Sequence, residues 1–183
     1  MAELKSYQLE GLAFLVHLER NGVGGILGDE MGLGKTIQTL ALFQYLRENA
    51  DMQGQIPGPF LVVCPLSVLT TWAQEVAKWV PHLTAFKYYG SQEERRSLRS
   101  LLSRRQGTVN QRRKRDHSAD KKPVVDIIIT TYDQITADLM WFQRTFDWRC
   151  IVLDEGHRIK NHLTRKSQAL QKLKTGFKLV LTG

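Results

Sequence analysis

Residues 25–40 read GILGDEMGLGKTIQTL, and this stretch decides the fold. A short apolar run ends at Gly28, a turn containing Gly32 and Gly34 follows, and an amphipathic helix is expected to begin near Lys35. Backbone N–H groups in such a turn and at a helix N-terminus point toward an anion, and the helix dipole stabilises it. Glycine lets the backbone approach that anion without an intervening Cβ atom. The stretch therefore predicts a strand, a phosphate-binding loop and a helix in succession.

The loop departs from the strict phosphate-loop pattern, G-x-x-x-x-G-K-[ST], at one position. Asp29 stands where that pattern has its first glycine, so only the shorter core G-x-G-K-T remains. Such a core also occurs by chance, and its position between a strand and a helix is what favours a nucleotide site. In that interpretation Lys35 reaches the β- and γ-phosphates of ATP, and the Thr36 hydroxyl binds Mg²⁺. The expected lining of the site is Asp29, Glu30, Met31, Gly32, Leu33, Gly34, Lys35 and Thr36.

A second cluster is acidic and follows another apolar run. Residues 150–157 read CIVLDEGH, which places Asp154 and Glu155 at the end of a buried strand. Adjacent carboxylates there need a partner, because burying an unpaired charge is costly. Mg²⁺ on the phosphates of ATP is one such partner, with Asp154 binding it through a water molecule and Glu155 orienting and deprotonating the attacking water. The alternative is a strand end with solvated carboxylates, and the phosphate loop in the same chain favours the metal.

Short apolar runs recur along the chain, with amphipathic helical segments between them. Most runs are unbroken rather than alternating, which is typical of strands covered on both faces of a parallel sheet. This order predicts an α/β fold: a doubly wound, mainly parallel sheet with helices on both faces, whose ligands bind at the carboxyl ends of the strands. The predicted strands are residues 24–28, 60–65, 85–89, 126–131, 150–154 and 178–182.

Several helices are predicted from stripes and caps. Residues 91–94 (SQEE) form a capping box, and Asp133 can cap another helix. The apolar stripes are Leu69, Trp72, Val76 and Trp79; Leu98, Leu101 and Leu102; Ile135 and Leu139; and Leu163, Leu170 and Leu173.

Composition describes an ordinary globular domain. The 183 residues favour a single domain, and 42% are hydrophobic and 24% charged. The start MAELKSYQLEG does not resemble a signal peptide, and no apolar run approaches the length of a membrane span. Cys64 and Cys150 lie in apolar runs, which favours buried thiols in a reducing compartment over a disulfide. We therefore expect an intracellular protein without a membrane partner.

The net charge of +8 is concentrated in one segment. Residues 104–122 contain eight Lys and Arg against two Asp, which leaves a net charge of +2 for the other residues. Within the segment, residues 107–122 (GTVNQRRKRDHSADKK) contain one large apolar residue and are expected to form a mobile surface insertion. Three roles stay open: a solvated loop, a nuclear localisation signal at residues 112–115 (RRKR), or an extra contact with DNA or nucleosomes.

The order of these elements resembles the Swi/Snf-type family of DNA-dependent ATPases within the helicase superfamily. The resemblance covers essentially the whole chain and begins at residues 4–11 (LKSYQLEG), where Gln8 matches the adenine-reading glutamine of the family. Six motifs in a fixed order are far more specific than any one of them. The other five are GDEMGLGKTIQT, FLVVCPLSVLTTW (60–72), ITTYD (129–133), DEGHRIKN (154–161), which is a variant of the DEAH box, and KLVLTG (178–183).

The resemblance implies the first of two RecA-like lobes, with ATP in the cleft between them and double-stranded DNA across both. It implies that Lys35, Asp154 and Glu155 carry the chemistry. It further implies that Gln8 joins the loop in binding ATP, and that His157 links the ATP site to DNA unless it is a structural histidine. Hydroxyls at strand ends suit contacts with DNA phosphates, which position a protein without reading sequence, although turn and cap chemistry is the alternative for each. These candidates are Ser67, Thr70, Thr130 and Thr131.

The resemblance also implies a function for the longer protein: a nuclear ATP hydrolase and DNA translocase that remodels nucleosomes. A translocase that displaces other DNA-bound proteins or acts in repair is the alternative, and an ATP-inactive docking module is a third. The intact loop and acidic residues argue against the inactive module. The chain stops at Gly183, inside the coupling motif of the family, without the second lobe and its arginine fingers. Because such an arginine contributes roughly 10³–10⁵ in rate, we expect the isolated lobe to be nearly inactive.

Overall fold

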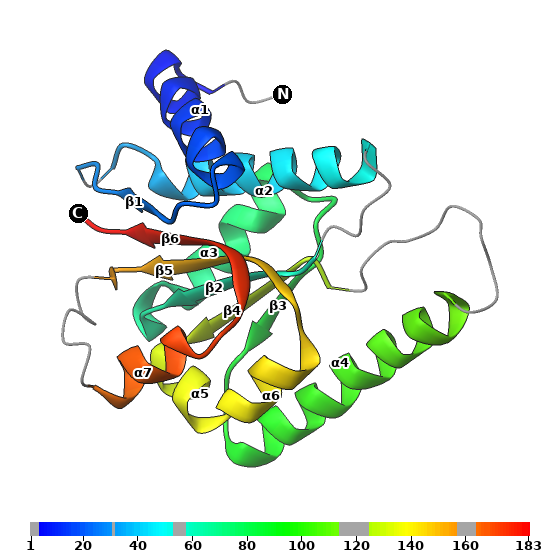
Figure 1. Cartoon of the computed structure of the whole chain (residues 1–183). Coiled ribbons are helices and arrows are strands. Elements are labelled where there is room, and N and C mark those ends of the chain that lie inside the picture. Colours follow the sequence, from blue (N-terminus) through cyan, green and yellow to red (C-terminus); the bar gives the residue numbers. More distant parts are fainter. Residues whose placement is uncertain (1–3, 31, 53–57, 114–124, 157–163) are drawn as a thin grey trace.

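The computed structural model describes residues 4–30, 32–52, 58–113, 125–156 and 164–183, with the backbone alone for residues 51 and 103–113. Its centre is a six-stranded sheet in the order β1-β6-β5-β2-β4-β3 (Figure 1). Every neighbouring pair is parallel, so the predicted doubly wound α/β fold is confirmed, with all six predicted strands present. The strands are β1 (Gly25–Leu27), β2 (Phe60–Cys64), β3 (Ala85–Tyr88), β4 (Ile127–Thr131), β5 (Trp148–Asp154) and β6 (Thr175–Leu181).

Helices cover both faces of the sheet (Figure 1). Side chains from α1, α2 and α3 pack on one face, and side chains from α4, α5, α6 and α7 pack on the other. Within the described residues, no helix is long and apolar enough to cross a membrane. The helices are α1 (Ser6–Arg20), α2 (Lys35–Met52), α3 (Leu66–Trp79), α4 (Gln92–Arg113), α5 (Tyr132–Ala137), α6 (Leu139–Thr145) and α7 (Arg165–Gln171).

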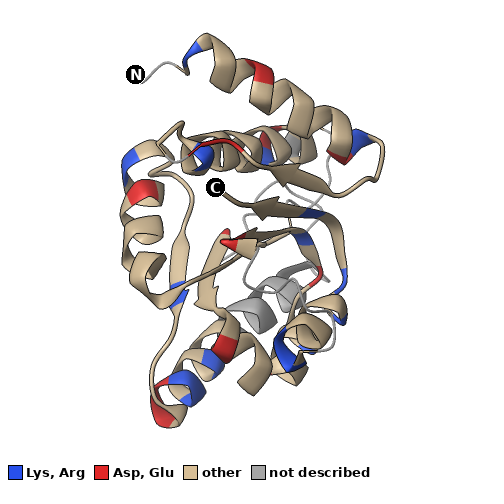
Figure 2. Cartoon of the chain, turned by 90° about the vertical axis from the view of Figure 1, so that its left-hand side faces the viewer, with Lys and Arg blue, Asp and Glu red and all other residues tan. Residues whose placement is uncertain are grey.

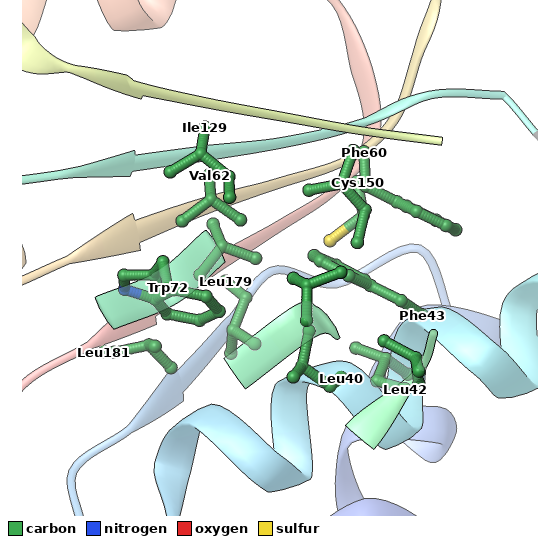
Figure 3. Packing of buried hydrophobic residues seen from close by; sticks show 14 of the residues in the cluster. Leu40, Leu42, Phe43, Phe60, Val62, Trp72, Ile129, Cys150, Leu179 and Leu181 are labelled. Carbon is green, nitrogen blue, oxygen red and sulfur yellow. The ribbon is translucent and has the colours of Figure 1, made fainter. Parts of the chain in front are cut away.

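The central strands are buried on both faces, as their unbroken apolar runs predicted. Every residue of β2 and of β4 is buried. Successive residues of β2 serve opposite layers, since Val62 packs with α1–α3 and Val63 with α4–α7. On α2, the ring of Phe43 stacks on that of Phe60 with centroids 4.3 Å apart (Figure 3). Burying a side chain of this size contributes about 1.5–3 kcal/mol, so the pair holds α2, and with it the loop that precedes it, against the sheet.

Two of the predicted helix signals are confirmed in detail. Leu69, Trp72 and Val76 of α3 are buried against the sheet. At the start of α4, the backbone N–H of Ser91 donates to Glu94 Oε2 at 2.6 Å, and the N–H of Glu94 donates to Ser91 Oγ at 3.3 Å. This is the reciprocal pair of a capping box.

The prediction that Asp133 caps a helix running through Ile135 and Leu139 is wrong. The N-cap of α5 is Thr131, and Asp133 lies in the first turn, where its carboxylate pairs with Lys166 at 2.7 Å. The helix also ends before Leu139, because Asp138 separates α5 from α6.

Asp138 interrupts the helix because its carboxylate is bound by three side chains from elsewhere in the chain. Tyr88 donates its hydroxyl to Asp138 Oδ2 at 2.7 Å, Arg95 donates Nε to the same oxygen at 2.6 Å, and Arg99 donates to Oδ1. Desolvation works against the charged carboxylate, but these bonds hold the pKa of Asp138 below its ordinary value. Partners in β3 and α4 are invisible to a local apolar pattern, which explains the error.

The basic segment begins as helix. Because α4 continues to Arg113, residues 107–113 are helical rather than loop-like, and Figure 1 shows the later turns of α4 extending away from the sheet. Residues 114–122 lie outside the described residues, so mobility and the three possible roles stay predictions.

The two cysteines are free and buried, as the sequence favoured. Burial, reinforced by the charge of Asp154, raises the pKa of the Cys64 thiol to about 12. Burial likewise raises the pKa of Cys150. Both thiols therefore stay protonated and act as small apolar side chains of the core.

Candidate functional site

The carboxyl ends of the parallel strands meet at one edge of the sheet, which faces the viewer in Figure 2. The phosphate loop follows β1, and Asp154 is the last residue of β5. Only β6 separates them, and its Leu181 is the register partner of both Leu27 and Asp154. The fold thus brings together the two motifs that the sequence singled out.

The loop has the backbone conformation that its glycines permit. Gly32 has φ 91° and Gly34 has φ 81°, values at which an L side chain is strained. A Cβ atom on Gly34 would also lie 2.6 Å from Nε2 of Gln8. Glycine at position 34 therefore serves both the turn and the close approach of α1. Met31, which was expected in the lining, lies outside the described residues.

Lys35 folds back onto the loop. Its Nζ donates to the backbone carbonyls of Asp29, at 2.5 Å, and Glu30, at 3.1 Å. An ammonium group has three donors, and a bound phosphate can replace these neutral acceptors with a charged one. Thr36 follows as the second residue of α2 and is half-buried. Lys35 is therefore bound to carbonyl groups of its own loop, and a bound anion can replace these hydrogen bonds.

Gln8 lies on the phosphate loop although it is far away in the sequence. Its side chain is buried, its Nε2 donates to the carbonyl of Leu33 at 3.4 Å, and its Oε1 accepts from the N–H of Lys5 at 3.0 Å. Contact between Gln8 and adenine stays a prediction.

Asp29, the departure from the strict pattern, is tethered to α2. Its Oδ2 accepts from Nε2 of Gln38 at 3.2 Å. Gln38 is fully buried, and its Oε1 faces Gly11 of α1 so closely that a Cβ atom there would collide with it. A side chain at position 29 thus holds the loop to the helix behind it. The sequence analysis did not identify Gln38. The one feature that could have indicated it is a side-chain amide on the helix that follows the loop.

The acidic pair is held by directed hydrogen bonds. Trp72 donates from Nε1 to Asp154 Oδ2 at 2.8 Å, and the N–H of Glu155 donates to Asp154 Oδ1 at 3.0 Å. Desolvation raises the pKa of Asp154 above its ordinary value, opposed by the Trp72 bond and by the charge of Lys35. Glu155 has φ 54°, the one positive φ of a non-glycine residue in the described segments. Such strain is concentrated at functional sites.

The residues present fit Mg²⁺ held jointly with a nucleotide. Mg²⁺ prefers oxygen ligands, keeps several waters, and takes only one or two carboxylates besides phosphates. The Thr36 hydroxyl and the partly desolvated Asp154 carboxylate match that set. The described residues contain no group of three or more His, Cys, Asp or Glu that could hold a metal ion.

The four hydroxyls proposed for DNA are not equivalent. Ser67 and Thr70 are exposed on α3, at the carboxyl end of β2. Thr130 is fully buried and donates its hydroxyl to the carbonyl of Tyr88 at 2.8 Å, which favours the structural alternative, while its contact with DNA stays a prediction. Thr131 is buried but lines a cavity of about 300 Å³.

This cavity, which we call the strand-end cavity, opens between the ends of β2 and β4. Leu66, Thr131, Tyr132 and Lys166 are among its lining. Figure 2 shows Lys, Arg, Asp and Glu interspersed over the described part of this face rather than one uniform basic patch. His157, the expected link between the ATP site and DNA, lies outside the described residues.

A phosphate loop after β1 and an acidic pair after β5, with one strand between them, define a RecA-like nucleotide-binding lobe. The family model of the SNF2-related domain matches residues 7–183, and the chain belongs to this family. In solved structures, it is similar to the SWI2/SNF2 ATPase core of Sulfolobus solfataricus in complex with double-stranded DNA. That match has 32% identity and a TM-score of 0.74, and covers all of this chain and 32% of that one.

Curated relatives carry names of the same kind. The chain is 43% identical to a probable ATP-dependent DNA helicase, CHR12, and 39% identical to the ATP-dependent DNA helicase DDM1, both of Arabidopsis thaliana and both over 99% of the chain. It is 38% identical over its whole length to the chromatin-remodeling ATPase INO80 of Gibberella zeae. The chain spans only 14%, 21% and 9% of these relatives.

Proposed function

We propose that this chain is the first ATP-binding lobe of a DNA-dependent ATPase that translocates on double-stranded DNA to remodel nucleosomes in the nucleus. The observation that carries the proposal is the phosphate loop and the Asp154–Glu155 pair at one sheet edge, separated by β6. The names of the relatives, which include ATP-dependent DNA helicases and chromatin-remodeling ATPases, support the substrate and the nuclear location.

In this proposal, the loop N–H groups and Lys35 bind the phosphates of ATP after Lys35 has left the carbonyls of Asp29 and Glu30. Thr36 and Asp154 hold Mg²⁺, which when bound neutralises charge on the phosphates. Glu155 orients the attacking water and takes its proton. Trp72 keeps the Asp154 carboxylate in place while the nucleotide enters.

DNA binds, in this proposal, over the carboxyl ends of β2 and β4. The exposed Ser67 and Thr70 hydroxyls can contact its phosphates beside the strand-end cavity, whose lining includes the Lys166–Asp133 ion pair. Phosphate contacts position a protein without reading sequence, which suits a motor that moves along DNA. A second lobe supplies an arginine worth roughly 10³–10⁵ in rate, so the 183 residues alone hydrolyse ATP barely.

Binding of Mg²⁺–ATP by the isolated chain tests the ATP site. Replacing Lys35 in Lys35→Ala removes charge-assisted bonds worth about 1.5–3 kcal/mol, so calorimetry should find affinity lower by roughly 10- to 150-fold. Lys87→Ala is the matched control, because Lys87 is exposed on the edge strand β3. Equal affinity in the Lys35 variant and the unchanged chain would overturn the site and favour an ATP-inactive docking module.

A further inference from the structure

Asp154 receives hydrogen bonds from two helices that pack on opposite faces of the sheet. Trp72 of α3 donates from Nε1 to the Asp154 carboxylate at 2.8 Å. Tyr132, the first residue of α5, donates its hydroxyl to the Asp154 carbonyl at 2.6 Å. These helices follow β2 and β4, which carry the surface proposed for DNA.

Both donors are held firmly by the core. Trp72 is 2% exposed and Tyr132 is 7% exposed. Figure 3 shows the Trp72 ring among Val62, Leu179 and Leu181, below the central strands. Since close-packed interiors transmit displacement rather than absorb it, a shift of α3 or α5 is passed to Asp154.

The hydrogen bonds from Trp72 and Tyr132 restrain the Asp154 side chain and the peptide that follows it. The carbonyl oxygen that Tyr132 binds belongs to the peptide joining Asp154 to Glu155, and the N–H of that peptide donates to Asp154 Oδ1. Trp72 binds the other carboxylate oxygen. The strained φ of Glu155 lies directly after this peptide. Tyr132 therefore holds this peptide directly, and Trp72 holds it through the Asp154 carboxylate.

Both donors are also adjacent to exposed binding groups. The Tyr132 side chain forms part of the wall of the strand-end cavity, together with Leu66 of α3. Ser67 and Thr70 are exposed on the same helix that carries Trp72. A phosphate in or beside this cavity would contact the elements of both donors without contacting Asp154.

We propose that Trp72 and Tyr132 are positioning residues that couple DNA at the strand-end cavity to the placement of Asp154 and Glu155. The inference rests on the proposed function, and it deepens that function by naming a route from DNA to the ATP site. Coupling between two sites is reciprocal, so DNA raises affinity for Mg²⁺–nucleotide by the same factor by which the nucleotide raises affinity for DNA.

The test measures binding rather than turnover. The dissociation constant of Mg²⁺ with a non-hydrolysable ATP analogue is measured by calorimetry on the 183-residue chain, with and without saturating duplex DNA. For the unchanged chain we expect DNA to tighten binding by roughly 5- to 150-fold, the usual range of coupling. Trp72→Phe and Tyr132→Phe keep the rings and remove one donor each. Because the ratio compares each variant with itself, it reports coupling whatever the affinity of that variant without DNA, and both changes should lower it toward one, Trp72→Phe by up to about tenfold and Tyr132→Phe by about two- to tenfold.

Matched variants separate coupling from general damage. Trp79→Phe removes an indole N–H from the same helix, where it bonds to Glu75 at 2.5 Å, and Tyr45→Phe removes a hydroxyl bonded to Arg20. Both should keep the full ratio. The inference is overturned if Trp72→Phe and Tyr132→Phe keep it too, or if the unchanged chain binds nucleotide and DNA independently. Failure of the unchanged chain to bind Mg²⁺–nucleotide at all would instead overturn the proposed function.

A second measurement uses the unchanged chain and therefore does not depend on the folding of any variant. The indole ¹H–¹⁵N resonance of Trp72, assigned through the backbone, should shift when duplex DNA is added without nucleotide, whereas that of Trp79 should stay in place. A Trp72 resonance that does not respond to saturating DNA would also overturn the inference.

Discussion

The phosphate loop and the Asp154–Glu155 pair lie at the same sheet edge but are held by different kinds of contact. In the loop, Lys35 binds carbonyl groups five and six residues away. At the acidic pair, Trp72 and Tyr132 donate to Asp154 across 82 and 22 residues. The loop is therefore satisfied mostly within itself, and the acidic pair is satisfied by the rest of the fold.

This difference in contacts indicates which of the two, the loop or the acidic pair, can rearrange when a ligand binds. A ligand can displace the carbonyls that Lys35 binds, because only the loop has to move. The bonds on Asp154 come from buried side chains, so this side is set before the ligand arrives. A catalytic constellation needs such preformed groups where chemistry occurs. We expect changes in the loop to alter binding, and a change at Glu155 to alter the chemical step.

The largest effect is expected at Glu155, in a longer protein that includes the second lobe. Glu155→Gln removes the group that takes the proton of the attacking water, so DNA-stimulated kcat should fall by roughly 10²–10⁴ with ATP binding retained. Steady-state kinetics and nucleotide binding on the same preparation check both parts. Glu93→Gln, at an exposed position of α4, is the control. A Glu155→Gln protein with unchanged kcat would contradict the division of roles between the two sides.

The next largest effect is expected in the loop. Gly34→Ala places a methyl group at φ 81° and 2.6 Å from Gln8 Nε2, so affinity for Mg²⁺–ATP should fall by roughly tenfold or more. Gly22→Ala is a matched control, because Gly22 has φ 66° with no neighbouring atom within 4 Å of the added Cβ. It carries similar backbone strain, so it should lower thermal stability and leave ATP affinity as it was.

The sequence predicted the conformation and position of the loop well because both are set by local residues. The two glycines, Gly32 and Gly34, act through backbone conformation, and Lys35 acts through contacts with nearby carbonyls. Both effects depend on residues that are close together in the sequence. The fold was predicted for the same reason, because an unbroken apolar run such as that of β2 indicates a strand that is buried on both faces of the sheet. The family motifs then ordered these parts into one domain.

What the sequence could not predict depends on contacts between distant segments. Asp138 divides a predicted helix because Tyr88 and Arg95 reach it from β3 and α4. Thr130 was predicted to contact DNA because it lies near a strand end, and its hydroxyl donates to a carbonyl of the neighbouring strand. Trp72 appeared in an apolar stripe and at the end of a family motif, and neither pattern records the partner of its indole N–H.

A smaller effect is expected where the loop does depend on another element. Gln38→Glu replaces the donor to Asp29 with a second carboxylate, so ATP affinity should fall several-fold, in keeping with coupling of about 0.5–3 kcal/mol between contacting residues. Adding Asp29→Asn restores the hydrogen bond in the opposite direction, because the amide introduced at position 29 donates to the carboxylate introduced at position 38. The double variant should therefore recover affinity relative to Gln38→Glu alone, as a binding cycle over all four proteins will measure. Independent, additive losses would show that the tether has no part in shaping the loop.

The smallest effect on the site is expected from Asp138, which anchors α4 away from both sides. Asp138→Asn should lower the free energy of unfolding by about 1–3 kcal/mol at neutral pH, since hydrogen bonds to a charged group are lost, and leave nucleotide affinity unchanged. The pKa of Asp138 is below its ordinary value of 3.8 in the folded chain, so its contribution is fully present above that value and is lost as pH falls through the lower, folded-state pKa.

Denaturant unfolding between neutral and acidic pH measures this difference directly. The stability gap between the unchanged chain and Asp138→Asn should narrow in the acid range, where the native carboxylate becomes protonated. Asp133→Asn is the control, because Asp133 and Lys166 form an exposed pair, and such pairs contribute little. If Asp138→Asn instead weakened nucleotide binding, α4 would be coupled to the site. The contrast between a self-contained loop and a fold-supported acidic pair would then have to include this third region.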